Sequence, residues 1–105
     1  MMSKRSVWCE FSPEERAIIY ERDYRRCIYC GSTNFLGIAH VFVSRAHRGK
    51  GCKENGVLLC QTCHYALDQG PDIELRAKIR NRCENYLYSK YGGISLEDLI
   101  YSKWK

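Results

Sequence analysis

The sequence lacks any uninterrupted apolar stretch that approaches the length needed to cross a membrane. Its first residues, MMSKRSVWCEF, include basic side chains but not the apolar run of a signal peptide. We therefore expect a cytoplasmic protein, in which thiols stay reduced. Secreted and membrane-spanning proteins are the classes that these absences argue against.

Internal repeats, low-complexity tracts and a second domain are also missing from the 105 residues. A chain of this length predicts one domain, 1–105. Small domains bury a limited core and often need a staple such as a bound metal. The aromatic share of 12% and the charged share of 28% are ordinary for a folded protein, so disorder is not expected.

Cysteine is abundant, and its odd count of seven argues against a complete set of disulfides. Four of the seven form two C-x2-C pairs, Cys27 with Cys30 and Cys60 with Cys63. Two intervening residues let both thiolates of a pair face one ion, and two such pairs complete a tetrahedral shell. The pattern predicts a structural zinc site, in preference to redox-active or merely buried thiols. Cys83 is expected in the core.

Acidic residues are absent from two stretches of a chain whose net charge is +5. The first stretch contains Arg45, His47, Arg48, Lys50 and Lys53. Clustered positive charge predicts that this loop contacts nucleic-acid phosphates, in preference to forming only a solvated surface. The second stretch, 76–82, carries four more basic residues, and for it the two interpretations are equally open.

Helix signals and hydrophobic periodicity predict an α+β domain. Ser12 followed by Pro13 is a helix start, and this helix is expected to reach about residue 23. Apolar runs at 36–43 and 56–60 predict two strands. Further helices are expected at 61–69, at 72–91 and, as a short last one, after Ser95. The long helix carries an apolar stripe of Leu75, Ile79, Cys83 and Leu87.

Two histidines and an asparagine accompany the cysteine pairs. We expect His40 on the first strand, Asn55 at the entry of the second and His64 in the first turn of the next helix. Phosphodiester hydrolysis needs an activated water, which a histidine can supply, and a cation that stabilises the phosphoryl and leaving oxygens. An asparagine amide suits a loop brace. The alternatives are a buried strand histidine, a simple Asn-Gly turn, and a histidine that only neighbours the zinc.

The motifs CIYCG, AHVFVSR and ENGVLLCQTCH stand in an order that resembles the HNH endonuclease family, whose core is a zinc-stapled ββα-metal (His-Me finger) fold. The resemblance covers about residues 22–70, followed by a helical tail at 72–105, and the layout is similar to small stand-alone HNH proteins of bacteriophages. It implies a metal-dependent DNA endonuclease that nicks or cuts both strands. The implied roles are general base for His40, brace for Asn55 and metal ligand for His64.

The resemblance also implies cofactors and partners. The catalytic ion would be Mg²⁺ or another divalent ion such as Mn²⁺ or Ni²⁺, beside the structural Zn²⁺. DNA would be the substrate, and a short ribbon and helix leave phosphate contacts dominant, so low sequence specificity is expected. By resemblance only, a phage terminase or packaging protein is a possible partner, inside the bacterial host cell.

One position departs from the family pattern. Many HNH enzymes carry Asp or His immediately before the base, where it ligates the ion, and this chain has Ala39. Asp68 follows His64 by four residues on the expected helix, so both side chains fall on one face, and Asp68 is a candidate substitute ligand. His47 is a second candidate, although a phosphate contact is the role favoured for it. An ordinary exposed aspartate is the alternative. Ala39 also favours a second class of function, a non-catalytic zinc-stapled module that binds nucleic acid.

Overall fold

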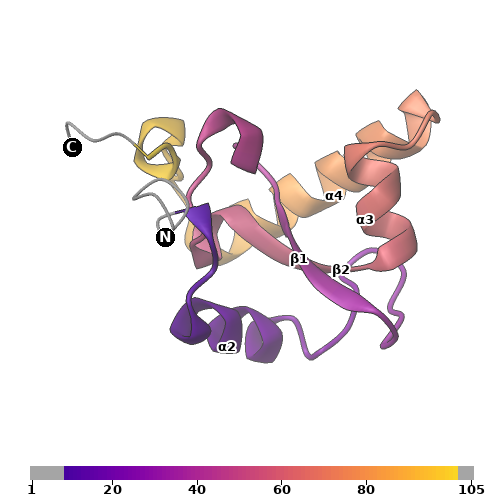
Figure 1. Cartoon of the computed structure of the whole chain (residues 1–105), viewed down its shortest axis with the longest axis horizontal. Helices are drawn as coiled ribbons and strands as arrows, with labels where there is room; N and C mark the ends of the chain where they lie inside the picture. The colour runs from indigo at the N-terminus through magenta and orange to yellow at the C-terminus, as the bar shows by residue number, and fades with distance from the viewer. Residues whose placement is uncertain (1–8, 102–105) are drawn as a thin grey trace, which may run out of the picture.

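In the computed structural model, residues 9–101 are described. The centre is an antiparallel hairpin of two strands, β1 (Leu36–His40) and β2 (Gly56–Cys60). One helix, α2 (Pro13–Arg22), lies on one side of the hairpin, and α3 (Gln61–Asp68) and α4 (Ile73–Tyr91) lie on the other side (Figure 1). The expected α+β class, with a ββα core between flanking helices, is confirmed.

Short 3-10 helices occupy the connections of the described chain. They are η1 (Arg45–His47), η2 (Lys53–Asn55) and η3 (Leu96–Leu99). The first two lie in the long loop between the strands, and the third takes the place of the short last helix expected after Ser95. Each is too short to be stable alone, so contacts with the rest of the domain determine its position.

The helices begin and end at residues that favour the start or the end of a helix. Ser12 caps α2, because its Oγ accepts a hydrogen bond from Glu15 N at 3.2 Å. Asp72 caps α4 in the same way, through Leu75 N at 3.0 Å. Gly92 ends α4 with a φ of +68°, a conformation that glycine adopts without strain. No helix in the described range is long and apolar enough to cross a membrane.

The first strand is shorter than its apolar run. The prediction of a strand through residue 43 is wrong at its end, because β1 stops at His40, which pairs with Gly56. Beyond that pair, Phe42 N and Val43 N donate to the side-chain Oδ1 of Asn55 instead of to a neighbouring strand. An asparagine amide thus replaces the partner strand at the point where the chain leaves the hairpin.

The core lies between the hairpin and the two helices α3 and α4. Alternate strand residues point into it, and the buried set includes Ala39, Val57, Leu59, Leu67, Ile79, Cys83 and Leu87. Cys83 has no exposed surface, as expected for a core thiol, and burial raises its pKa to about 12. The stripe predicted on 72–91 is the face of α4 that completes this core.

A charged network fixes α2 against the hairpin. The Arg22 guanidinium is paired with Asp23 and donates to the carbonyl oxygens of Lys53 and Gly56, both at 2.7 Å. Asp23 accepts from Leu58 N at 2.9 Å and from the Tyr86 hydroxyl at 2.6 Å. The Arg22–Asp23 pair therefore bonds to η2, β2 and α4. Polar groups as well as the core thus connect the two sides of the hairpin.

Candidate active site and metal centre

The four cysteines of the two C-x2-C pairs meet at one point beside the start of β1 and the end of β2. Their Sγ atoms all lie within 4.8 Å of one another, and Cys30 Sγ is 3.5 Å from Cys60 Sγ. Thiolates bound at about 2.3 Å to a tetrahedral zinc ion are about 3.8 Å apart, so the spacing fits zinc. The predicted metal site of Cys27, Cys30, Cys60 and Cys63 is therefore present as a cluster.

Backbone amides favour the thiolate of Cys27. Burial opposes ionisation there, but N–H groups of Cys30, Cys60 and Tyr29 outweigh it and lower the pKa of Cys27 to about 7. Burial and the neighbouring thiols of Cys60 and Cys27 raise the pKa of Cys63 well above its ordinary value. Thiolate ligation by Cys63 thus needs the charge of a metal ion, which links ion binding to proton release.

His40, the last residue of β1, is held by the segment that precedes α2. Its Nε2 lies 3.0 Å from the carbonyl oxygen of Cys9, and the Phe11 ring packs on the imidazole with centroids 4.7 Å apart. A carbonyl can only accept, so Nε2 carries the proton and Nδ1 keeps the lone pair. Burial lowers the pKa of His40; the Cys9 carbonyl partly opposes this, and the charge of Arg45 adds to it. The neutral ring is therefore favoured near pH 7.

Asn55 has no exposed surface, and its amide is fully used. Oδ1 accepts from Phe42 N at 2.9 Å and from Val43 N at 3.1 Å. Nδ2 donates to Val43 O at 2.9 Å and to Lys50 O at 3.1 Å. These contacts join both ends of the loop between the strands, directly after His40, and they are the contacts of a brace.

His64 and Asp68 lie one turn apart on α3 and touch. His64 Nε2 is 2.9 Å from Asp68 Oδ2, and the two side chains are 35% and 47% exposed. Adjacent ligands of an octahedral ion at about 2.1 Å are about 3 Å apart, so this spacing fits two neighbouring coordination positions. Within residues 9–101, no third His, Cys, Asp or Glu joins the pair as a three-ligand group. Water and substrate would supply the remaining ligands.

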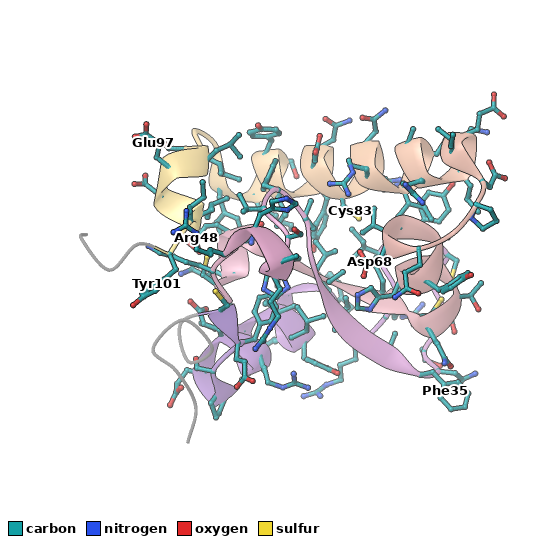
Figure 2. All side chains as sticks on the ribbon, turned by 45° about the horizontal axis from the view of Figure 1, so that its top comes forward. Phe35, Arg48, Asp68, Cys83, Glu97 and Tyr101 are labelled. Carbon is teal, nitrogen blue, oxygen red and sulfur yellow. The ribbon has the colours of Figure 1, made fainter. Side chains whose placement is uncertain are left out.

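These side chains share one hollow of about 450 Å³, whose walls include His40, His64 and Asp68. Arg45 of η1 and Arg16 of α2 contribute the basic side chains of its lining. Figure 2 shows Asp68 at the carboxyl end of α3, toward the middle of the molecule. The expected base and both expected ligands therefore face the same space, and positive charge stands beside them.

Ala39 does not reach this hollow. It pairs with Val57 in the sheet, is fully buried and belongs to the core, and it is absent from the lining of the hollow. The residue that departs from the family pattern is thus a core residue in this chain, and His64 and Asp68 form the exposed pair.

The family model of the HNH endonucleases matches residues 27–69, from the first cysteine to the end of α3. After this match, residues 27–69 are called the HNH domain. Among solved structures, the chain is similar to the Type IV phosphorothioation-dependent restriction endonuclease ScoMcrA, with a TM-score of 0.57 and 20% identity. The match covers 76% of this chain and 20% of the other, so this chain spans about a fifth of that protein. At this identity the likeness shows the fold. No curated protein matches.

Parts of the candidate site lie outside the HNH domain. Cys9, Phe11 and Arg16 precede it, and sequence reasoning did not single them out. Two glycines of the domain show why the preceding segment fits so closely: a Cβ on Gly56 would stand 2.5 Å from the Phe11 ring, and one on Gly51 would stand 2.3 Å from the Glu10 backbone. A glycine in a strand or loop indicates that another segment of the backbone approaches closely, but the sequence does not identify that segment.

The five basic loop residues of the HNH domain do not all line the hollow that contains His40. Arg45 lines the hollow and pairs with Glu10 at 3.5 Å, while His47 is exposed and meets Ser44 Oγ at 2.7 Å. Arg48 is exposed, and its carbonyl accepts from Tyr101 N at 2.8 Å, away from Asp68 in Figure 2.

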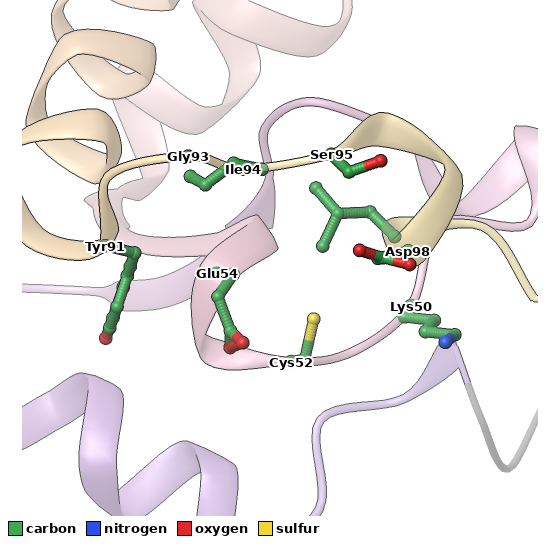
Figure 3. Close-up of a pocket in the computed structure, with 9 residues that line it drawn as sticks. Lys50, Cys52, Glu54, Tyr91, Gly93, Ile94, Ser95 and Asp98 are labelled. Atoms are coloured by element: carbon green, nitrogen blue, oxygen red, sulfur yellow. The ribbon is translucent and has the colours of Figure 1, made fainter.

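The remaining two loop residues, Lys50 and Lys53, do not line the hollow that contains His40. Lys50 lines a second hollow with Cys52, Glu54 and Asp98 (Figure 3), and Lys53 pairs with Glu54 at 3.4 Å. This hollow shares no lining residue with the one that contains His40. Of the five predicted phosphate contacts, the structure brings Arg45 to the candidate site.

The second acid-free stretch lies on α4 and is split by its contacts. Arg76 donates to Gly70 O at 2.5 Å and Arg80 donates to Val41 O at 2.8 Å, so both serve the protein backbone. Lys78 and Arg82 are exposed. The two interpretations, a nucleic-acid contact and a solvated surface, therefore both stay open for Lys78 and Arg82.

Proposed function

We propose that this chain is a divalent-metal-dependent endonuclease that hydrolyses phosphodiester bonds of DNA. The observation that carries the proposal is the shared hollow, where His40, His64 and Asp68 converge beside Arg45 and Arg16. The HNH family match to residues 27–69 supports the same chemistry. A hollow in which phosphate contacts dominate suits binding of a DNA duplex with low sequence specificity.

His40 is the general base. With Nε2 bonded to the Cys9 carbonyl, Nδ1 accepts a proton from a water molecule in the hollow. The resulting hydroxide attacks phosphorus, the bond to the 3′ oxygen breaks, and that oxygen takes a proton from water, leaving 5′-phosphate and 3′-hydroxyl ends. The lowered pKa of His40 keeps the ring neutral and ready to accept at pH 7.

His64 and Asp68 would hold the catalytic ion, which matches the way Mg²⁺ binds through few protein ligands and several waters. When bound, the ion would polarise the phosphoryl oxygen and stabilise charge on the leaving oxygen. Arg16 and Arg45 bind and orient the phosphates on either side. Asn55 keeps the His40 strand end in place through the loop backbone.

A plasmid nicking assay tests the proposal. Wild type is expected to cleave with Mg²⁺, Mn²⁺ or Ni²⁺, and His40→Ala is expected to lose roughly a hundredfold to ten-thousandfold in rate, the usual contribution of a general base. His47→Ala is the matched control, because His47 is an exposed histidine that does not line the hollow of His40. Equal losses in both variants, or full activity in His40→Ala, would sink the assignment of His40.

The second candidate function is a zinc-stapled module that binds nucleic acid without cutting it. Gel-shift measurements with the same proteins separate the two candidates. DNA binding by wild type with no cleavage in any ion supports the module. A terminase-type partner, a phage origin and a cytoplasmic location stay predictions.

A further inference from the structure

The end of β1 leaves one backbone carbonyl without its strand partner. Val41 N donates to Asn55 O at 2.9 Å, as the next rung of the ladder after the pair His40–Gly56. A regular antiparallel pair of this type exchanges two bonds, and the second would run from Asn55 N to Val41 O. Asn55 N instead donates to Cys52 O at 2.9 Å within η2. The Val41 carbonyl thus loses its ladder donor.

Arg80 supplies the missing donor from α4. Its Nη1 lies 2.8 Å from Val41 O, and Val41 itself is 2% exposed. A buried carbonyl without a donor costs about 1–3 kcal/mol, so a side chain that satisfies it is strongly held in place. Arg80 follows the core residue Ile79, so the helix that closes the core also presents this guanidinium to the strand end.

Arg80 and Asn55 hold the two ends of one peptide group. The peptide that joins Val41 to Phe42 has its carbonyl oxygen on Arg80 Nη1 and its N–H on Asn55 Oδ1 at 2.9 Å. This peptide lies one residue beyond His40. The plane of the peptide determines the direction in which the strand leaves His40, and with it the position of the imidazole relative to the Cys9 carbonyl and the hollow.

We propose that Arg80 is a positioning residue for His40, a role that rests on the proposed nuclease function. Without Arg80, the peptide is held at its N–H alone, and its carbonyl group can rotate about that bond. The Nδ1 atom of His40 then moves relative to the water and phosphate in the hollow. A displacement of about 1 Å in a reacting group lowers a rate by roughly a hundredfold.

Kinetics of three variants test the role. Arg80→Met keeps the length of the side chain but removes its donors, and Arg80→Lys restores one donor and the charge. Arg82→Met removes a charge from an exposed position of the same helix and is the control. Arg80→Met is expected to lower kcat by roughly tenfold to a hundredfold with little change in KM for DNA. Arg80→Lys should recover part of the loss, and Arg82→Met should leave kcat unchanged.

A readout without substrate separates this role from the nuclease proposal. Nitrogen chemical shifts of the His40 ring, assigned by their loss in His40→Gln, report which nitrogen carries the proton. Wild type and Arg82→Met are expected to show one tautomer, protonated on Nε2, whereas Arg80→Met should show a mixture of both. Zinc content and circular dichroism establish whether each variant is folded. If Arg80→Met does not fold, Arg80→Lys is compared with wild type in its place.

Each outcome decides something. An inactive wild type with the tautomer change still seen in Arg80→Met rejects the nuclease and keeps the positioning role. If Arg80→Met raises KM alone and leaves both kcat and the His40 shifts unchanged, Arg80 is a phosphate contact and the positioning role is wrong. Loss of kcat with unchanged shifts also overturns it.

Discussion

Ala39 and Val57 face each other across the hairpin, and neither side chain has any exposed surface. A carboxylate placed at residue 39 would therefore enter the apolar core between the sheet and α3 instead of the hollow. Restoring the acidic residue that many HNH enzymes carry here is expected to damage the fold and to add no ligand.

Ala39→Asp should lower the free energy of unfolding by roughly 3 kcal/mol, because it buries an ionisable group without partners. Urea unfolding at pH 7 measures this. Ala77→Asp adds the same charge on the exposed face of α4 and should change stability far less. A stable Ala39→Asp protein that binds Mn²⁺ more tightly than wild type would show that residue 39 does reach the ion.

Asp68→Asn should weaken binding of the catalytic ion, because the amide keeps the shape of the side chain and loses its charge. The Mn²⁺ concentration that gives half-maximal cleavage should rise by about tenfold or more, and Mn²⁺ binding followed by electron paramagnetic resonance should weaken in parallel. His64→Ala should have a similar effect.

Asp98→Asn is the matched control for Asp68→Asn, since Asp98 is an exposed aspartate on the second hollow. If both aspartate variants respond to Mn²⁺ as wild type does, Asp68 is an ordinary surface residue.

The rate should fall at low pH as His40 becomes protonated. Burial holds the pKa of His40 below its ordinary value of 6.5, so the acid limb of kcat/KM should have its midpoint below that value. A midpoint at or above 6.5 contradicts this environment for the base.

Stability should depend on pH through the same group. Since the folded pKa of His40 is lowered, its contribution is complete above pH 6.5 and is lost as pH falls toward the folded pKa, where the unfolded chain binds the proton first. Urea unfolding of wild type and His40→Gln between pH 5 and 7.5 isolates this contribution. His47→Gln, which alters an exposed histidine, should keep the wild-type dependence.

Removal of the structural metal should unfold the domain. One zinc ion per chain is expected by elemental analysis, and a strong chelator or Cys30→Ser should abolish the cooperative thermal transition, because the four thiolates join the two ends of the hairpin to α3. Cys52→Ser is the matched control, as Cys52 is half-buried and lies outside the cluster. A zinc-free wild type with an unchanged transition would show that the cysteines act only as core thiols.

Local chemistry in the sequence was enough to predict several features. The cap at Ser12 and the two C-x2-C pairs act over a few residues, so their consequences follow from spacing alone. The four-residue step from His64 to Asp68 likewise placed both side chains on one helix face. The same reasoning overextended β1, because the strand ends where a distant side chain, Asn55, takes over its hydrogen bonds.

Tertiary packing decided the rest of the candidate site. The contact of Cys9 with His40, the entry of Arg16 into the hollow and the bond from Arg80 to Val41 each join residues that lie far apart in the chain. Packing also placed Arg45 in the lining of the His40 hollow and left Lys50 and Lys53 out of it, although all three share one loop. The order of residues determined which groups were available for the site. Only the folded backbone determined which of them face one another. The Val41 carbonyl without a strand partner and the close contacts at Gly51 and Gly56 exist only after distant segments have packed together.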